Sequence, residues 1–254
     1  MKSAKFYTIW FSQRNGSSLL CEGLKSTGVL GKPEELFTIG PNETLLSKHQ
    51  AKDYRDLQRI IYDLGTSSNG VFGVKTNAPL KENDPVIAAL RQCPNARKAA
   101  KSNYATWESM FPNCQHIFLT RRNKVRQAVS WWKAIVTKEW HRKSGDKLPV
   151  LLEDLVERYN FNALKHLLIE TTIRESKIQA FLAEGQQQAL TIVYEDFVKD
   201  YQGTILQIAD FLGEVVDPSK IGQPYYVKLA DIISDEWVER FRKELQKDWS
   251  SQIW

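Results

Sequence analysis

The sequence has few cysteines, and their positions exclude a disulfide framework and a zinc ribbon. Cys21, Cys93 and Cys114 are the three cysteines in 254 residues, and no two of them form a CxxC pair. A disulfide framework needs paired cysteines, and a zinc ribbon needs closely spaced pairs of ligands. The four histidines show no spacing typical of a metal site or a nucleophilic pair. We therefore expect reduced thiols and no bound metal.

Long apolar runs are also missing. The longest run near the start, Phe6–Phe11, is followed at once by Ser12, Gln13 and Arg14. A membrane-spanning helix needs about 18 apolar residues, and the core of a signal peptide also needs a longer run than this one. We expect a cytoplasmic protein without a membrane span.

The composition excludes a disordered chain, a collagen-like fibre and a coiled coil. Hydrophobic residues make up 42% and charged residues 26%, which is close to the average of globular proteins. The net charge of +5 favours anionic ligands, but no RNA-binding signature or zinc-finger spacing is present, so nucleic acid is not expected as a partner. Without a repeat or a linker, residues 1–254 are predicted to form a single domain.

Short apolar segments alternate with helical patterns along the chain. The helical patterns predict one long amphipathic helix from near Asn123, further helices that stop near Gly185 and Gly213, and a last helix over 234–245 with Ser234 as its N-terminal cap. Strands alternating with helices predict a three-layer α/β fold with a mainly parallel sheet, whose ligand sites lie at the carboxyl ends of the strands. The four expected strands are Phe6–Phe11, Val71–Val74, His116–Thr120 and Leu190–Tyr194.

The turn after the first strand is a candidate phosphate site. Residues 12–18 connect the strand to a helix, so backbone N–H groups and the positive end of the helix dipole point at one spot. Gly16 allows close approach of the backbone, Ser17 and Ser18 offer hydroxyls, and Arg14 offers charge. A serine-capped helix after a strand is an equally good interpretation of the local sequence. The Gly-Lys pair of a Walker A loop is absent, which disfavours a metal-dependent ATP site.

A second basic site follows the third strand. Arg121 and Arg122 end the strand, and Ser130 lies about two turns into the next helix, so Arg122 and Ser130 can reach one anion. The alternative to an anion site is that these basic residues are simply solvated at the start of the helix. Because cations oppose the dipole at a helix N-terminus, the functional interpretation is favoured.

The sequence resembles the PAPS-dependent sulfotransferases, and most closely the bacterial trehalose 2-sulfotransferase family. The matching blocks occur in order over most of the chain, and their combination is more specific than any one block. They are residues 12–20 (SQRNGSSLL), 31–37 (GKPEELF), 69–75 (NGVFGVK), 122–134 with QAVSWWKA at its end, 193–196 (VYED) and 234–238 (SDEWV).

The resemblance implies a P-loop-NTPase-like sulfotransferase fold and a role for each motif. Arg14, Asn15, Gly16, Ser17 and Ser18 would hold the 5′-phosphosulfate of 3′-phosphoadenosine 5′-phosphosulfate (PAPS). Arg122 and Ser130 would hold its 3′-phosphate. Arg14 would also stabilise charge on the bridging oxygen. Glu35 would be the general base, and its neighbour Glu34 is the alternative candidate for that role. A homodimer is the family's oligomeric state.

The proposed chemistry is physically reasonable without a metal. A sulfuryl group carries one negative charge, so guanidinium, hydroxyl and backbone donors can stabilise its transfer. A carboxylate such as Glu35 can accept the proton of the acceptor hydroxyl. Without the resemblance, two acids after Pro33 would instead indicate the start of a helix.

Other residues favour structural roles. A lysine at the end of a strand is usually solvated, so Lys75, at the end of the second strand, is expected to be solvated and not part of the site. Trp132 and Trp140 lie on the apolar face of the long helix and are expected in the core, although Trp131, Trp132 and Trp140 could also line a sugar pocket. Residues 194–196 are expected to brace the end of the fourth strand.

The leading hypothesis is a sulfotransferase that moves a sulfuryl group from PAPS to a hydroxyl of a carbohydrate or glycolipid, with a trehalose-like sugar favoured. The alternatives are a sulfotransferase acting on a non-sugar alcohol, a magnesium-dependent ATP kinase, and a non-catalytic module that binds a nucleotide or a sulfated glycan.

Overall fold

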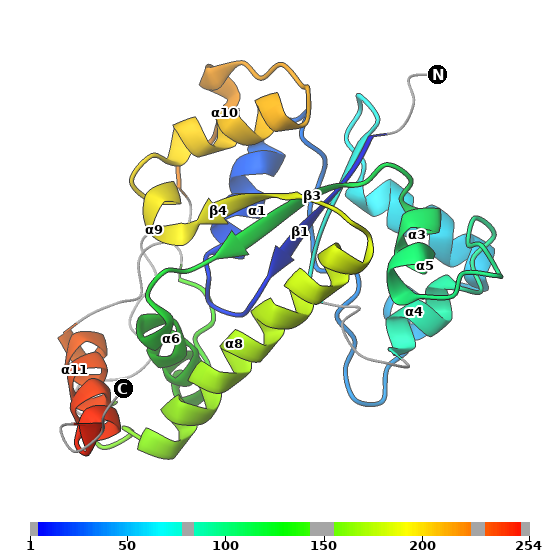
Figure 1. The fold of residues 1–254 in the computed structure, drawn as a ribbon. Helices are drawn as coiled ribbons and strands as arrows, with labels where there is room; N and C mark the ends of the chain where they lie inside the picture. Colours follow the sequence, from blue (N-terminus) through cyan, green and yellow to red (C-terminus); the bar gives the residue numbers. More distant parts are fainter. Residues whose placement is uncertain (1–4, 78–83, 143–154, 225–231, 250–254) are drawn as a thin grey trace.

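The centre of the molecule is a four-stranded parallel sheet (Figure 1). The computed structural model describes residues 5–77, 84–142, 155–224 and 232–249. The strand order is β2-β1-β3-β4, and the pairing of Phe11 with Leu119 brings the ends of β1 and β3 side by side. The α/β fold class and all four expected strands are confirmed: β1 is Lys5–Phe11, β2 Val71–Thr76, β3 Gln115–Thr120 and β4 Ala189–Val193.

Helices cover both faces of the sheet, because side chains of each buried strand alternate between two apolar clusters. Trp10 packs into the cluster formed by α2, α3, α4, α5 and α8, whereas its neighbour Ile9 packs into the cluster formed by α1, α9 and α10. These helices are α1 Ser17–Ser26, α2 Leu45–Lys48, α3 Tyr54–Gly65, α4 Pro85–Leu90, α5 Asn103–Met110, α8 Phe161–Glu184, α9 Tyr194–Phe197 and α10 Tyr201–Phe211, with a short 3₁₀ turn η1 at Pro218–Lys220.

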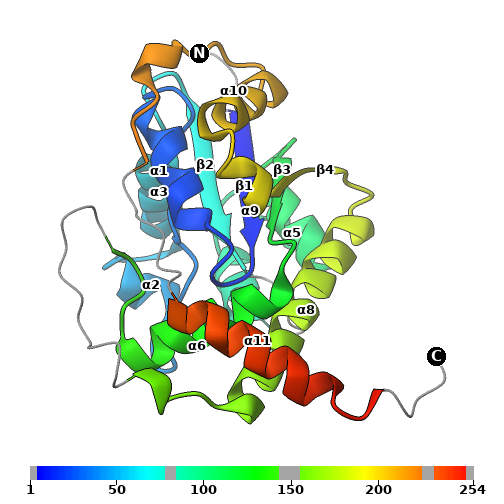
Figure 2. The same ribbon diagram turned by 90° about the vertical axis from the view of Figure 1, so that its left-hand side faces the viewer.

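Two helices lie across the carboxyl ends of the strands (Figure 2). They are α6, Lys124–Thr137, and α11, Ile232–Gln246. Val129 of α6 and Trp237 of α11 are buried in a third apolar cluster, which also includes residues of α8. This cluster holds α6 and α11 beyond the end of the sheet, where parallel α/β folds bind their ligands.

Most of the predicted helix ends are confirmed. Asn123 caps α6, since its side chain accepts a hydrogen bond from the backbone N–H of Arg126. Gly185 ends α8, and Gly213, in the left-handed conformation with φ of 65°, follows α10. The early part of the helical pattern, from Leu151, lies partly outside the described residues.

Three details differ from the prediction. Ser234 is no N-terminal cap, because α11 is already helical at Ile232 and Ser234 is buried within it. Trp140 follows the end of α6 and is 42% exposed instead of buried in the core. Trp131 is more deeply buried than the half-buried Trp132, because α6 has packed neighbours on several sides.

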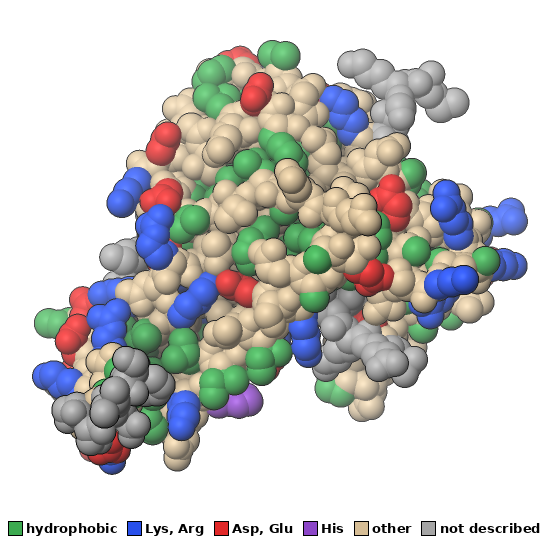
Figure 3. Space-filling model, in the orientation of Figure 1, with side chains coloured by type: hydrophobic (Ala, Val, Ile, Leu, Met, Phe, Trp, Pro, Cys, Tyr) green, Lys and Arg blue, Asp and Glu red, His purple; other side chains and the backbone are tan. Residues whose placement is uncertain are grey.

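The surface charge is uneven. On the face drawn in Figure 3, Lys and Arg side chains gather beside α9 and α6 and again around α3 and α5. Among the helices that the structure describes, none combines the length and the apolar character needed to cross a lipid bilayer.

Candidate active site

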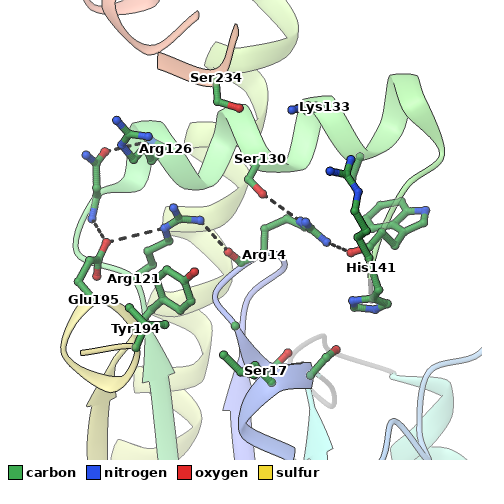
Figure 4. Close-up of a pocket in the computed structure, with 18 of the residues that line it drawn as sticks. Arg14, Ser17, Arg121, Arg126, Ser130, Lys133, His141, Tyr194, Glu195 and Ser234 are labelled. Carbon is green, nitrogen blue, oxygen red and sulfur yellow. Dashed lines mark hydrogen bonds and ion pairs between the residues drawn. The ribbon is translucent and has the colours of Figure 1, made fainter. Parts of the chain in front are cut away.

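A cavity of about 700 Å³ opens where the chain leaves β1 and β3 (Figure 4). The turn between β1 and α1 forms one wall, and α6 with the residues that follow it forms the opposite wall. Residues of α9, α10 and α11 close the remaining sides. Six of its lining residues are cationic, against two acidic ones: Arg14, Arg121, Arg126, Lys133, Arg142 and Lys199, with Glu139 and Glu195. Such a balance favours an anionic ligand.

The N-terminus of α1 faces this cavity without a side-chain cap. Gly16 is the cap residue, with φ of 89°, and no acidic residue lies in the first turn of α1. A Cβ atom on Gly16 would overlap the ring of Tyr194, so both its backbone conformation and its surroundings require glycine. Ser17 and Ser18 begin the helix and line the cavity. Their backbone N–H groups and the helix dipole form a cradle suited to a phosphate or sulfate group.

Arg14 links this cradle to α6. Its backbone has φ of 65°, a conformation that non-glycine residues adopt rarely. The side-chain Nε donates to the Ser130 hydroxyl at 3.1 Å, and Nη1 donates to the carbonyl of Trp140. Burial, and next the nearby charge of Arg121, lower the pKa of Arg14 to about 10. Arg14 is therefore still a cation at neutral pH, and an anion in the cavity would relieve its unfavourable surroundings.

Arg121 is the second buried cation of the cavity. It is 9% exposed, and its Nη1 donates to the carbonyl of Arg14 at 3.2 Å. Its guanidinium lies 4.7 Å from the centre of the Tyr194 ring, and its Nε is 3.7 Å from a carboxylate oxygen of Glu195. Burial lowers the pKa of Arg121. Arg14 and Arg121 thus converge on one space, where a shared anion would stabilise both.

The structure places Arg122 outside this cavity. Its guanidinium pairs with the Asp196 carboxylate at 2.6 Å, and the Arg122 side chain is 60% exposed. The backbone N–H groups of Arg122 and Asn123 donate to Glu195 at 2.8 and 3.1 Å. This anchoring turns Arg121 inward and Arg122 outward. Residues 194–196 therefore brace the turn between β3 and α6 as well as the end of β4.

The turn between β3 and α6 lowers the pKa of the Glu195 carboxyl group. Burial raises the pKa of its carboxyl group, but the two N–H donors and Arg121 lower the pKa by more, so the net shift is downward. A carboxylate at the start of α6 also compensates the helix dipole there. The start of α6 is therefore already occupied by a protein anion, in contrast to the start of α1.

Asn15 supports the turn and does not face the cavity. Its side chain is fully buried, and Nδ2 donates to the carbonyl of Leu119 at 2.6 Å. This hydrogen bond ties the end of the β1 turn to β3. The structure thus brings Arg14, Gly16, Ser17, Ser18 and Ser130 together at the cavity, with Asn15 behind them.

Lys75 is buried behind Ser18, contrary to the expectation of a solvated lysine. It is 5% exposed, and its Nζ donates to the Ser18 hydroxyl at 3.0 Å. The same Nζ lies 3.0 Å from a carboxylate oxygen of Glu35. Lys75 therefore connects the start of α1 to Glu35.

Glu34 and Glu35 face different neighbours. Glu35 accepts a hydrogen bond from Thr38 at 3.1 Å and pairs with Lys75, beside the start of α1. Glu34 pairs instead with Lys25 in the last turn of α1, at 2.5 Å. Residues 31–35 form no helix, so the capping alternative for these two acids is wrong.

The far end of the cavity combines an aromatic ring with polar groups. Trp140 and His141 line it, together with Glu139 and Arg142, which form two hydrogen bonds of 2.5 Å with each other. Burial, and then the cations Arg14 and Lys75, lower the pKa of His141, so its imidazole is neutral at pH 7. Of these four residues the sequence pointed to Trp140, as one of three tryptophans that could line a sugar pocket. It gave no such signal for Glu139, His141 and Arg142, which follow the end of α6.

Glu175 of α8 holds the walls together from behind. Its carboxylate accepts hydrogen bonds from Ser12 and Thr120 at 2.9 Å each and from Lys124 at 2.6 and 2.7 Å. These partners follow β1, end β3 and begin α6. No sequence signal joins them, since they lie far apart in the chain.

Known proteins resemble this chain over nearly its whole length. The Stf0 sulphotransferase family matches residues 6–244. The chain is 26% identical to the trehalose 2-sulfotransferase of Mycolicibacterium smegmatis, with 95% of this chain and 96% of that protein covered. It is 24% identical to the trehalose 2-sulfotransferase of Mycobacterium tuberculosis, with 96% of each covered.

Solved structures are less similar. A sulfotransferase domain from the curacin biosynthetic pathway has a TM-score of 0.48 and 18% identity, with 92% of this chain and 83% of that chain covered. A sulfotransferase domain from the Synechococcus PCC 7002 olefin synthase has a TM-score of 0.47 and 16% identity, with 100% and 98% covered.

The family match covers most of the chain, including β1, the turn between β1 and α1, and α6, which form the cavity walls. The chain therefore belongs to the Stf0 sulphotransferase family and is a sulfotransferase enzyme.

Proposed function

We propose that this enzyme transfers the sulfuryl group of PAPS to a hydroxyl of a trehalose-like sugar. The observation that carries the proposal is the convergence of Arg14, Arg121 and the uncapped start of α1 on one cavity. PAPS has two anionic ends, and these groups offer donors for both. The names of the two curated relatives support trehalose as the acceptor.

The 5′-phosphosulfate would bind at the start of α1. Gly16, Ser17 and Ser18 offer backbone N–H groups and hydroxyls, and Asn15 holds the turn in place. As the bond from sulfur to the bridging oxygen breaks, negative charge grows on that oxygen. Arg14 and Lys75 are the cations suited to stabilise this charge.

The 3′-phosphate would bind beside Ser130. The family resemblance assigns this phosphate to Arg122 with Ser130, but Arg122 pairs with Asp196 outside the cavity. Arg121 lines the cavity with Ser130. We therefore assign the cationic role at this phosphate to Arg121, and to Arg122 only a bracing role through Asp196.

The acceptor hydroxyl would be activated by Glu35. The oxygen of the acceptor hydroxyl attacks the sulfur atom of PAPS while the proton of that hydroxyl passes to the Glu35 carboxylate. The nucleotide leaves with the electrons of the broken S–O bond. Glu35 is 40% exposed and pairs with Lys75, which also contacts the start of α1. Glu34 pairs with Lys25 and is less suited to this role.

The sugar would lie near Trp140. Aromatic faces and paired charged side chains are well suited to the apolar and hydroxyl-bearing sides of a pyranose. Trp140 and the Glu139–Arg142 pair supply both at the same end of the cavity.

Transfer from radiolabelled PAPS to a panel of acceptors tests the proposal. The panel contains trehalose, other disaccharides, glucose and non-sugar alcohols, each with and without EDTA. We expect labelled trehalose in both conditions. Tight binding of desulfated nucleotide without labelled product from any acceptor would contradict a transferase acting on this panel, and label only on non-sugar alcohols would contradict the sugar assignment.

A further inference from the structure

The backbone of Arg14 has a rare conformation at the edge of the cavity. Its φ of 65° lies in the left-handed region that non-glycine residues seldom occupy, so contacts with the surrounding structure must stabilise it. Figure 4 draws two such contacts: Arg121 donates to the carbonyl of Arg14, and the Arg14 side chain donates to Ser130. The peptide group that joins Gln13 to Arg14 takes part in neither, although its orientation sets the φ of Arg14.

Gln127 of α6 anchors this peptide group. The Gln127 side chain is fully buried, and its Nε2 donates to the carbonyl of Gln13 at 2.7 Å and to the Ser12 hydroxyl at 2.8 Å. A backbone carbonyl can only accept hydrogen bonds, so this contact fixes which end of the Gln127 amide faces the turn. Both donor hydrogens of Gln127 therefore bind the two residues that precede Arg14.

Packing alone does not account for a glutamine at this position. The Oε1 atom of Gln127 is buried and has no hydrogen-bond partner among the residues that the structure describes. A buried acceptor without a partner lowers stability, and a methionine of similar length has no such atom. The two hydrogen bonds to the turn are therefore what a glutamine provides here and an apolar side chain does not.

Helix α6 contacts both ends of Arg14. Gln127 and Ser130 are three residues apart, so they lie on the same side of the helix. Gln127 holds the peptide group before Arg14, and the Ser130 hydroxyl accepts a hydrogen bond from the Arg14 guanidinium at 3.1 Å. One rigid helix thus fixes the backbone and the side chain of Arg14 relative to each other.

We infer that Gln127 is a positioning residue for sulfuryl transfer, which holds the Arg14 guanidinium where charge grows on the bridging oxygen. The inference rests on the proposed function, in which Arg14 stabilises that charge. Gln127 acts through Arg14, since it lies behind the turn and outside the described lining of the cavity. The charge on the bridging oxygen is larger in the transition state than in bound PAPS. Loss of Gln127 should therefore lower the transfer rate by a larger factor than nucleotide affinity.

A double-mutant cycle with Arg14 tests the inference. Single-turnover transfer from PAPS to trehalose is measured for the wild type, Gln127→Met, Arg14→Ala and the double variant. We expect Gln127→Met to lower the rate by about tenfold to a hundredfold, because two hydrogen bonds to the turn are lost. In the Arg14→Ala background the same substitution should lower the rate by less than about twofold. Calorimetry with adenosine 3′,5′-bisphosphate should show a smaller factor for affinity than for rate in Gln127→Met.

Gln115→Met is the matched control. Gln115 begins β3, at the end of the sheet opposite the cavity, and its Nε2 also donates to a backbone carbonyl, that of Phe211, at 2.6 Å. We expect its transfer rate to equal that of the wild type. Melting without ligand verifies that each variant is folded. If Gln127→Met does not fold, Gln127→Asn takes its place in the cycle with the same expected result, because its shorter side chain cannot reach both acceptors.

Two results would overturn the inference while leaving the proposed function intact. One is a wild-type transfer rate in the Gln127 variant, and the other is an equal factor of loss in the wild-type and Arg14→Ala backgrounds, which would mean that Gln127 does not act through Arg14. If Arg14→Ala itself transferred at the wild-type rate, or if the wild-type enzyme labelled no trehalose, the proposed function would be contradicted, and the inference would fail with it.

Discussion

Neighbouring residues in this chain can have very different chemical surroundings. Glu35 contacts Lys75, which reaches the start of α1, whereas Glu34 contacts Lys25 on the outer side of that helix. A base must lie within hydrogen-bond reach of the proton that it accepts. The position of its carboxylate beside Lys75 and the start of α1 therefore favours Glu35 over Glu34 as the proposed base, a preference that the sequence alone does not give.

We expect Glu35→Gln to lower the rate of transfer by a factor of about 10² to 10⁴, because the amide cannot accept the proton of the acceptor. Nucleotide affinity should stay close to that of the wild type. Single-turnover measurements with saturating PAPS report the chemical step directly.

Glu34→Gln is the matched control for this prediction. Glu34 pairs with Lys25 at the surface, where such a contact contributes less than about 1 kcal/mol. Its transfer rate should therefore be close to that of the wild type. Equal rates in the Glu35 variant and the wild type would exclude Glu35 as the base.

Several residues of the site were predictable and others were not. The turn with Gly16, Ser17 and Ser18 was predictable because a strand, a turn and a helix follow one another directly. The burial of Lys75 was not, because its partners Ser18 and Glu35 come from segments distant in the sequence. Ser234 resembled a helix cap, but tertiary packing extends α11 beyond it.

At the scale of whole elements, the strands were the most predictable part. Each is a short buried apolar run bounded by polar or turn residues, and this pattern holds wherever helices cover both faces of a sheet. The pattern says nothing about strand order. The apolar periodicity of α6 predicted only part of which side chains are buried. The helix packs against α8 and α11 and also faces the cavity, so it has more than one buried side.

The position of α6 depends on a contact from another helix. Glu175 of α8 binds Ser12, Thr120 and Lys124, so one carboxylate joins the ends of two strands to the start of α6. The Glu175 side chain is 13% exposed. Removing its charge leaves Lys124 and two hydroxyls with a poorer partner.

We expect Glu175→Gln to lower the free energy of unfolding by about 2 to 3 kcal/mol and also to weaken nucleotide binding, because Ser12 precedes Arg14 in the turn. Urea unfolding measures the first effect and calorimetry the second. Glu244→Gln removes an exposed pair with Arg240 on α11 and should cost less than about 1 kcal/mol. Similar losses in the two variants would contradict the joining role of Glu175.

The stability of the whole molecule should depend on pH through a buried histidine. His116 is 1% exposed, on the side of the sheet covered by α5 and α8, and its Nδ1 accepts a hydrogen bond from the Trp10 indole at 3.0 Å. Its Nε2 is buried and has no hydrogen-bond partner among the described residues. Burial lowers the pKa of His116 to about 4, so the folded protein keeps this imidazole neutral.

The unfolded chain, with an ordinary histidine pKa of about 6.5, binds a proton at this position more readily than the folded protein does. Stability is therefore unaffected above about pH 6.5 and falls as the pH drops toward about 4. Between about pH 7.5 and about pH 5 the loss from His116 amounts to about 2 kcal/mol. His116→Gln keeps an acceptor for Trp10 but does not titrate, so urea unfolding should show a loss smaller by about this amount in the variant. Because both proteins share all other titrating groups, parallel pH profiles would mean that His116 is already charged in the folded state or stays neutral in both states.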